Sequence, residues 1–147
     1  MWKEREFFMN QKPFKILGIE HIGIAKESVE GILEIFSDIL GLEFIGNENV
    51  MDQSVMTKIF DTGSGKLEFL QATHSDSSIT DFINKKGEGM HHVALLVDHL
   101  QLALDYLKNK GIKLIDETPR IGAEGLSIAF LHPTSTGGIL IELCEKK

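Results

Sequence analysis

The chain has 147 residues, of which 42% are hydrophobic, which is enough for one compact core or two fused half-domains. Its formal net charge of −7 argues against a nucleic-acid partner, and no apolar run reaches the roughly 20 residues of a membrane span. The single cysteine, Cys144, cannot form an internal disulfide and favours a reducing compartment. The charged N-terminal residues lack the apolar stretch of a secretory signal, so we expect a cytoplasmic protein.

The first half of the chain predicts elements in the order β-α-β-β-β. Residues 16–25 alternate isoleucine with other residues, as a strand does. A helix is expected over residues 28–40, where apolar side chains fall on one face and Gly41 follows as a stop. Three short strands separated by polar or glycine-containing turns are expected next, over residues 42–47, 54–60 and 66–71.

The second half repeats this order. A strand is expected first, then a helix with Asp98 as its N-cap and Gly111 after its end, and then three more strands. The strand and helix cover residues 91–97 and 99–109, and the later strands cover 112–116, 126–132 and 138–144. We divide the chain into a frayed or loosely docked N-terminal extension (1–16), a first βαβββ module (17–74), a connecting helix and turn (75–89) and a second βαβββ module (90–147).

The two modules also share sequence, which indicates an internal duplication. The stretch that begins IEHIGIA aligns with the stretch that begins MHHVALL and pairs His21 with His92, an offset of 92 − 21 = 71 positions. The strand KLEFLQ aligns with LIELCE and pairs Glu68 with Glu142, an offset of 142 − 68 = 74 positions. A duplicated unit that carries one imidazole and one carboxylate supplies four metal ligands when its two copies face each other.

The surroundings of these four residues favour one shared site. A lone histidine in an apolar strand is more often a core residue, and a lone strand glutamate more often faces solvent. Strand alternation, however, places His21 on one face with Gly23 and Ala25, and His92 with Ala94, so small neighbours leave a hollow beside each ring. A carboxylate in an apolar strand is costly to bury unless it is paired, hydrogen-bonded or metal-bound. We therefore expect the two histidines and two glutamates to converge on a divalent cation.

Two other histidines lie near this pattern. Alternation along the strand predicts that His91 points to the face opposite His92. His132 lies beside the last turn, where it either lines the site or caps the turn.

Three stretches carry a family resemblance: IEHIGIA, FINKKGEGMHHVALLVD and GIKLIDETPRIGAEGLSIAFLHPTSTGGILIEL. They resemble the vicinal oxygen chelate superfamily, which includes glyoxalases and bleomycin-resistance proteins, and most closely its methylmalonyl-CoA epimerase branch. The resemblance implies an α+β fold in which two βαβββ modules in tandem form a cupped mixed sheet around a metal site. It also implies four ligands: His21, Glu68, His92 and Glu142.

The resemblance further implies a metal-dependent epimerase that interconverts the 2R and 2S forms of methylmalonyl-CoA. The α-proton would leave and return through a metal-stabilised enolate, with Glu142 as one base. The implied ion is cobalt, manganese, nickel or zinc, the implied partner is an acyl-CoA thioester, and the implied assembly is a homodimer. Arg120 and His132 are the further candidates for contact with the substrate.

The sequence departs from the epimerase pattern at one important position. Thr57 stands where the family has a glutamate that acts as the second base, and threonine cannot act as a base near neutral pH. Lys58, Glu48 and a metal-bound water are alternatives for that second proton transfer. A lysine of the family is also replaced, by Thr134, and substrate identity is least secure over residues 46–80.

Other members of the superfamily offer alternative functions. A glyoxalase I-like lyase acting on a hemithioacetal would use the same kind of metal site, but the HPTSTGGILIEL ending and the GEGMHH junction favour the epimerase. A non-enzymatic binding or resistance module commonly loses metal ligands, whereas all four are present here. A ring-cleaving dioxygenase uses two histidines and one carboxylate, and this chain offers a fourth ligand.

Overall fold

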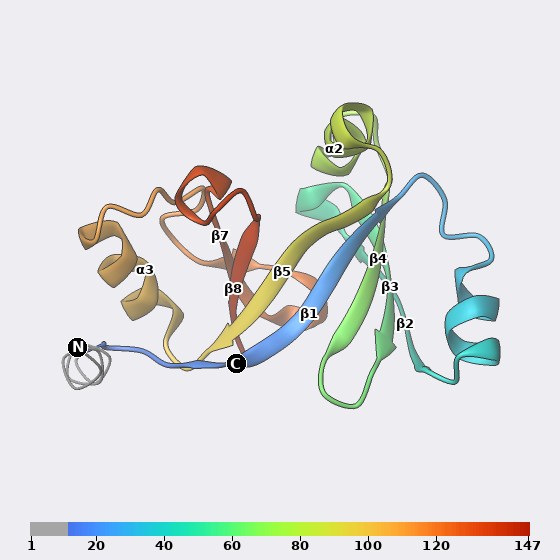
Figure 1. The fold of residues 1–147 in the computed structure, drawn as a ribbon, viewed down its shortest axis with the longest axis horizontal. Helices are drawn as coiled ribbons and strands as arrows, with labels where there is room; N and C mark the ends of the chain where they lie inside the picture. Colours follow the sequence, from blue (N-terminus) through green and yellow to red (C-terminus); the bar gives the residue numbers. More distant parts are fainter. Residues whose placement is uncertain (1–11) are drawn as a thin grey trace.

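A computed structural model describes residues 12–147, and within them eight strands form one sheet (Figure 1). The strands are β1 (Ile16–Lys26), β2 (Glu43–Val50), β3 (Val55–Asp61), β4 (Lys66–Ala72), β5 (Gly89–Val97), β6 (Arg120–Ile121), β7 (Ser127–Leu131) and β8 (Ile141–Glu145). The longer helices are η1 (Glu34–Ile39), α2 (Ser78–Lys86) and α3 (Leu100–Asn109). The single turns are η2 (Met51–Gln53), η3 (Ala123–Gly125) and η4 (Pro133–Ser135).

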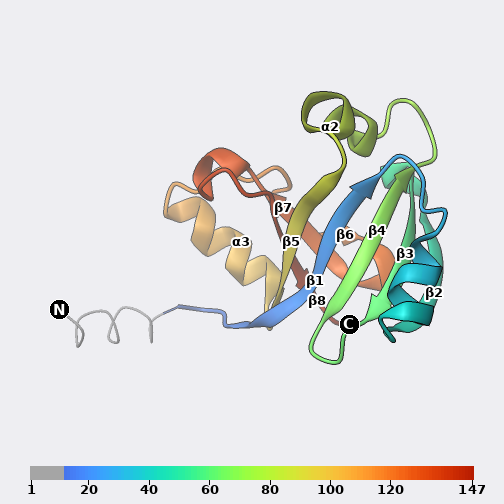
Figure 2. The ribbon, with the colours of Figure 1, turned by 45° about the vertical axis from the view of Figure 1, so that its right-hand side comes forward.

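The order of strands in the sheet reflects the duplication. It runs β2-β3-β4-β1-β5-β8-β7-β6, so the first half (β1–β4) and the second half (β5–β8) meet where β1 and β5 pair in antiparallel fashion. β4 lies parallel to β1, and β8 lies parallel to β5. Counted outward from the centre of the sheet, the first half therefore runs β1-β4-β3-β2 and the second half runs β5-β8-β7-β6, which is the same internal order. Figure 2 shows the sheet curling around, which confirms the predicted α+β fold with a cupped mixed sheet.

The curl brings the two ends of the sheet close together. The backbone N–H of Glu124 in η3 donates a hydrogen bond of 2.8 Å to Glu48 Oε2 of β2. The Glu124 side chain accepts a 2.8 Å bond from Lys66 at the start of β4. Contacts of this kind join the loop between β6 and β7 in the second half to the first half.

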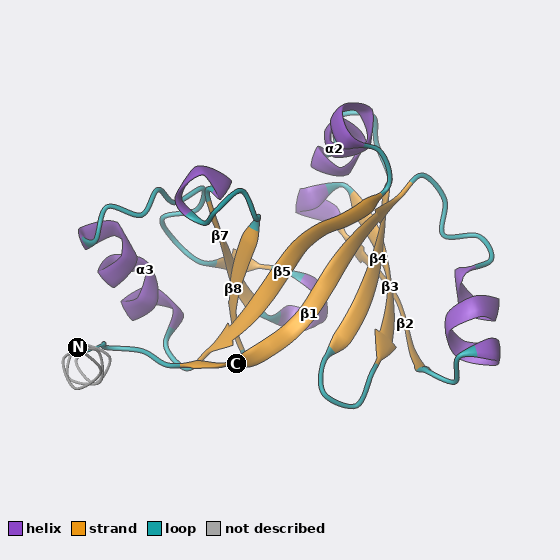
Figure 3. Cartoon of the chain, in the orientation of Figure 1, coloured by secondary structure: helices purple, strands orange, loops and turns teal. Residues whose placement is uncertain are grey.

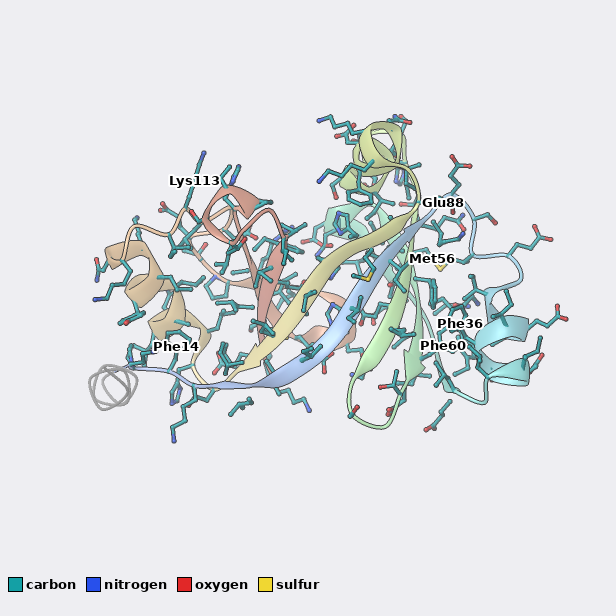
Figure 4. The ribbon with its side chains drawn as sticks, viewed as in Figure 1. Phe14, Phe36, Met56, Phe60, Glu88 and Lys113 are labelled. Carbon is teal, nitrogen blue, oxygen red and sulfur yellow. The ribbon has the colours of Figure 1, made fainter. Side chains whose placement is uncertain are left out.

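One helix packs on the outer side of each half, as Figure 3 shows for η1 and α3. Phe36 of η1 lies beside Phe60 (Figure 4), with 6.0 Å between their ring centroids. The centroid of the Phe69 ring is 4.6 Å from that of Phe36. In the second half, Leu100 and Leu104 of α3 are fully buried in a core that also contains Phe14. Apolar burial on these outer sides leaves the inner side of the sheet available for polar residues.

Two predicted elements differ from the structure. The helix predicted over residues 28–40 is shorter, because Gly31 has a φ of 79° and forms a turn before it, and its main part is a π-helix. The strand predicted over 112–116 is wrong: Leu114 makes only an isolated bridge to Leu131. The partner of β7 at the sheet edge is instead the short β6, where Arg120 pairs with Ile128.

The start of α3 also differs from expectation. Asp98 does not cap α3, because its Oδ1 accepts a 2.7 Å bond from the Lys15 N–H. The side chain of Glu145 in β8 instead caps the N-terminus of α3, where it accepts a 3.1 Å hydrogen bond from the Leu100 N–H. Residues 1–11 of the predicted extension lie outside the described residues. Within its remainder, Phe14 is buried 5.8 Å from the Tyr106 ring, whereas the other residues of 12–16 are exposed.

Within residues 12–147, no helix is both long and apolar enough to cross a membrane.

Candidate metal centre and active site

The four predicted ligands come from the four central strands of the sheet. His21 lies on β1, Glu68 on β4, His92 on β5 and Glu142 on β8, and all four side chains are buried. The sequence repeat therefore places one histidine and one glutamate from each half at the centre of one sheet. The structure brings all four predicted residues together.

Two small residues stand between these side chains. Gly23 of β1 is opposite Glu68 on one side and His92 on the other. A Cβ atom at Gly23 would overlap the imidazole ring of His92, so only glycine leaves room for that ring. Ala94 is the equivalent residue of the second half and lies opposite His21 and Glu142. The hollow expected from small neighbours is therefore present on both strands.

His21 lies within about 3 Å of the donor atoms of the other three predicted ligands. His21 Nε2 is 3.0 Å from His92 Nε2, 3.2 Å from Glu68 Oε2 and 3.0 Å from Glu142 Oε2. His92 Nε2 is 3.8 Å from Glu142 Oε2. Nitrogen and oxygen ligands at about 2.0–2.2 Å from a metal are separated from one another by about 3 Å. Donor atoms form two overlapping trios that share His21, one with His92 and Glu142 and the other with Glu20 and Glu68.

One oxygen of the cluster has no hydrogen bond. Glu142 Oε2 is buried, and although His21 Nε2 is 3.0 Å away, their directions do not form a hydrogen bond, so this oxygen is unpartnered among the described residues. A buried acceptor without a donor is unfavourable. Two imidazoles and two carboxylates match the ligand preferences of cobalt, manganese, nickel and zinc. The residues therefore fit a divalent cation.

The two imidazoles have opposite electrostatic surroundings. Burial disfavours the charged form of His21, but the carboxylates of Glu142, Glu20 and Glu68 outweigh burial and raise its pKa to about 10. Burial lowers the pKa of His92 well below its usual value, and the charge of His21 lowers it further. Burial also raises the pKa of Glu68 to about 7. Without a metal ion, the cluster therefore holds a proton on His21, while His92 stays neutral.

A cavity of about 390 Å³ lies against this cluster. All four predicted ligands line it, together with apolar side chains from both halves such as Leu70 and Ile128. Its size is within the range of small-molecule sites, and its walls combine apolar groups with a few polar ones. Thr57 is fully buried in this wall, and its hydroxyl has no hydrogen-bond partner among residues 12–147.

Arg120 supplies a fixed positive charge to the cavity wall. Its guanidinium lies 5.6 Å from the centre of the Phe130 ring, which packs edge-on 5.6 Å from the His92 ring. Its Nε is 3.4 Å from Asp116 Oδ1 but makes no hydrogen bond within the described part of the chain. Arg120 Nη1 is 3.9 Å from Asp52 Oδ2 of the first half. The predicted substrate-binding position of Arg120 is thus within the cavity.

Several other candidates lie elsewhere. His132 is not in the cavity wall, and its Nδ1 accepts a 3.2 Å bond from the Thr134 N–H, so it caps η4. Lys58 Nζ lies 4.9 Å from the Phe44 ring centre and Glu48 bonds to η3, and neither lines the cavity. The structure therefore does not bring these three residues to the site.

Sequence reasoning missed two residues that contact the ligands. Glu20 Oε1 is 3.3 Å from His21 Nδ1, and His91 Nδ1 is 2.9 Å from His92 Nδ1. The prediction that His91 points away from the site is wrong, because its side chain lines the cavity. One signal was available: Glu20 and His91 are equivalent positions of the repeat, 71 residues apart.

Comparison with known proteins identifies relatives of this chain in sequence and in fold. The model of the Glyoxalase/Bleomycin resistance protein/Dioxygenase superfamily matches residues 20–130. The uncharacterized protein YqjC of Bacillus subtilis is 42% identical over 129 residues, which cover 88% of this chain and 92% of that one. Mitochondrial methylmalonyl-CoA epimerase of Mus musculus is 35% identical over 138 residues, covering 92% and 78%. A variant of Streptomyces coelicolor methylmalonyl-CoA epimerase in complex with 2-nitronate-propionyl-CoA is 30% identical, with a TM-score of 0.84, covering 90% and 96%.

The chain therefore belongs to the glyoxalase, bleomycin resistance and dioxygenase superfamily. Within it, the chain is similar to methylmalonyl-CoA epimerases in sequence and in fold. The predicted family resemblance is confirmed, and so is the prediction of an epimerase-like isomerase.

Proposed function

We propose that this protein is a metal-dependent epimerase that interconverts the 2R and 2S forms of methylmalonyl-CoA. The observation that carries the proposal is the unpartnered oxygen of Glu142, buried beside two imidazoles at the wall of a ligand-sized cavity. Support also comes from relatives named as epimerases of this thioester. Epimerisation requires removal of the α-proton and its return on the opposite face.

His21, Glu68, His92 and Glu142 are the residues that would hold the ion. When bound, a divalent cation supplies Lewis-acid chemistry, which polarises the thioester carbonyl and makes the α-proton more acidic. All four side chains are buried and fixed by the central strands. Residues on rigid strands hold a site more accurately than residues on loops do.

Glu142 is the group to which we assign the first proton transfer. A general base must reach the proton that it removes through a free lone pair. Its Oε2 lies in the cluster without a hydrogen-bond donor, and its side chain lines the cavity. Glu142 would thus share its carboxylate between the ion and the substrate.

Thr57 does not serve as the second base, and its hydroxyl remains a neutral group in the wall. The other titratable side chains of the wall, outside the four ligands and Arg120, are Asp52, Asp76 and His91. The return of the proton on the second face falls to one of these groups or to solvent within the cavity.

Arg120 would pair with an anionic group of the acyl-CoA substrate. Its guanidinium stacks near Phe130 within the cavity wall, and its Nε lacks a hydrogen-bond partner among residues 12–147. Charge-assisted bonds from arginine to carboxylate or phosphate are strong and directional. Arg120 would therefore orient the substrate and not take part in proton transfer.

We also propose that the protein forms a homodimer. Ile16, Leu17 and Ile19 at the start of β1 are each about half exposed, and neighbouring apolar side chains of this kind favour burial against another surface. Light scattering coupled to gel filtration should give twice the mass of the chain. A monomer at micromolar concentration would contradict the assembly but not the activity.

The activity is tested with one epimer of methylmalonyl-CoA in deuterated water. The cobalt-loaded protein should introduce deuterium at Cα and remove the stereochemical purity of the thioester, as followed by mass spectrometry and a stereospecific coupled assay. Absence of both changes, together with turnover of a hemithioacetal, would replace the epimerase with a glyoxalase.

A further inference from the structure

A bulge in β1 changes the direction in which the Glu20 side chain points. Ile19 pairs with Leu95 on β5, and the next pair is His21 with Ala94, so Glu20 has no residue opposite to it. An extra residue of this kind interrupts the alternation of side chains along a strand. Glu20 is accordingly buried next to His21 although the two residues are neighbours in sequence. Its Oε1 comes within 3.3 Å of His21 Nδ1.

A second bulge does the same in β5. Gly23 pairs with His92, and the next pair is Ile24 with Met90, so His91 has no residue opposite to it. The His91 side chain thus lies beside His92 at the cavity. Its Nδ1 is 2.9 Å from His92 Nδ1.

The two bulges are equivalent features of the duplicated halves. Glu20 and His91 are 91 − 20 = 71 residues apart, which is the separation of the two ligand histidines. Both contacts reach Nδ1 of the ligand ring and leave Nε2 facing the centre, where the two Nε2 atoms are 3.0 Å apart. A hydrogen bond at one ring nitrogen determines which nitrogen is available for a metal.

Contacts from other segments hold each of these residues. Lys66 Nζ is 3.4 Å from Glu20 Oε1 and 2.8 Å from Glu124 Oε1 of the second half. The His91 ring packs edge-on against Phe82 of the connecting helix α2, with 4.9 Å between centroids. Glu20 is therefore held by Lys66 of its own half, which in turn pairs with Glu124 of the second half. His91 is held by the segment that joins the halves.

We infer that Glu20 and His91 are positioning residues of the metal centre, each accepting the Nδ1 hydrogen of the adjacent histidine so that Nε2 is presented to the ion. This inference rests on the proposed function to the extent that the function requires a metal at the site. The two acceptors differ, because Glu20 offers a carboxylate and His91 offers a neutral imidazole nitrogen. A carboxylate makes its histidine a stronger electron donor than a neutral acceptor does.

Cobalt binding to four substituted proteins tests the inference. Glu20→Leu and His91→Leu remove the acceptors, whereas Glu20→Gln and His91→Asn keep an amide oxygen that can accept from Nδ1–H. Glu88→Gln is the control, because Glu88 is also a hydrogen-bond acceptor, here for the Glu27 N–H, and pairs with Lys26 and not with any of the four ligands. Calorimetry gives the affinity for Co²⁺, and the visible absorption of bound Co²⁺ reports the ligand arrangement.

We expect the two leucine variants to bind Co²⁺ about 10–100-fold more weakly, with altered absorption, as removal of partners of metal-bound histidines generally does. The amide variants should recover most of the affinity, and Glu88→Gln should match the unsubstituted protein. Leucine variants that bind within about twofold and keep the same absorption would overturn the inference. Amide variants that lose as much as the leucine variants would also overturn it.

Nitrogen-15 spectra of the unsubstituted zinc-loaded protein provide a test that does not depend on how the variants fold. Long-range proton–nitrogen correlations should place the hydrogen on Nδ1 and the metal on Nε2 of both His21 and His92. A metal bound through Nδ1 of either ring would contradict the inference while leaving the metal centre intact. A protein that binds neither Co²⁺ nor Zn²⁺ would instead overturn the metal centre and the proposed function with it.

Discussion

The two halves of the sheet supply the same kinds of ligand but surround them differently. His21 of the first half lies among three carboxylates, which raise its pKa to about 10. His92 of the second half lies next to imidazoles, and burial lowers its pKa well below the usual value. Duplication can thus provide a symmetric set of metal ligands, while neighbouring residues give each ligand its own chemistry.

Gly23 and Ala94 form the sharpest contrast between the halves. Each lies opposite the histidine of the other half, but Ala94 carries a Cβ beside His21, whereas a Cβ at Gly23 would overlap the His92 ring. We expect Gly23→Ala to displace His92, to abolish metal binding and to lower the free energy of unfolding by about 1–3 kcal/mol. Ala94→Gly should retain the metal. Mass spectrometry measures the metal content, and denaturant unfolding measures the stability. A Gly23→Ala protein with a full complement of metal would contradict the predicted difference between Gly23 and Ala94.

Substitutions of Glu142 and of Glu68 should separate the effect of losing the base from the effect of changing a metal ligand. Glu142→Gln removes the assigned base and should reduce kcat by about 10²–10⁴-fold. Glu68→Gln leaves an amide oxygen in place of a carboxylate and should alter kcat much less. Initial rates at fixed metal occupancy are the measurement. Equal losses for the two substitutions would show that the carboxylates act only as ligands.

Substitution of Arg120 tests its proposed role in substrate binding. Arg120→Gln should raise KM for the acyl-CoA by about 10–100-fold, because loss of a hydrogen bond to a charged group weakens binding by about 1.5–3 kcal/mol. The kcat value should change little, since Arg120 is neither a proposed metal ligand nor the assigned base. Arg120→Lys keeps the charge, so its KM should lie between the KM of the unsubstituted protein and that of Arg120→Gln. A fall in kcat at unchanged KM would place Arg120 in the chemical step instead.

The pKa difference between the histidines is directly measurable in the metal-free protein. His21 should remain protonated at pH 8, whereas His92 should be neutral at pH 6, as followed by the ring resonances in NMR. Because the pKa of His21 is raised on folding, it stabilises the metal-free fold below about pH 6.5, and this contribution is lost as pH rises toward 10. Metal binding must displace the same proton, so affinity should increase with pH over this range. A His21 resonance that titrates near pH 6.5 would contradict the difference.

The ligands could be predicted from the sequence because strand alternation and the repeat both act locally. His21 and His92 occupy equivalent positions, and each has small neighbours on its own strand face. The positions of Glu20 and His91 could not be predicted in this way. Their bulges depend on how β1 pairs with β5, which lies some seventy residues away in the chain.

The remaining differences also arise from contacts between distant segments. The apolar alternation of residues 112–116 resembles a strand. This segment does lie against the end of β7, where the Ile115 N–H donates to the Phe130 carbonyl, but it forms only an isolated bridge, and the short β6 pairs with the start of β7. The helix at 28–40 has a regular apolar pattern, and a single turn at Gly31 shortens it. Asp98 has the chemistry of an N-cap, but its carboxylate instead accepts a hydrogen bond from the N–H of Lys15, just before β1.

The central claim is that both halves contribute ligands to a single ion, and metal stoichiometry in ligand variants tests it most directly. The unsubstituted protein, loaded with Co²⁺ and freed of excess by gel filtration, should contain one ion per chain. Glu68→Ala from the first half and His92→Ala from the second should each reduce this to near zero, with thermal unfolding showing that both variants fold. Stoichiometric cobalt retained by either variant would contradict the claim.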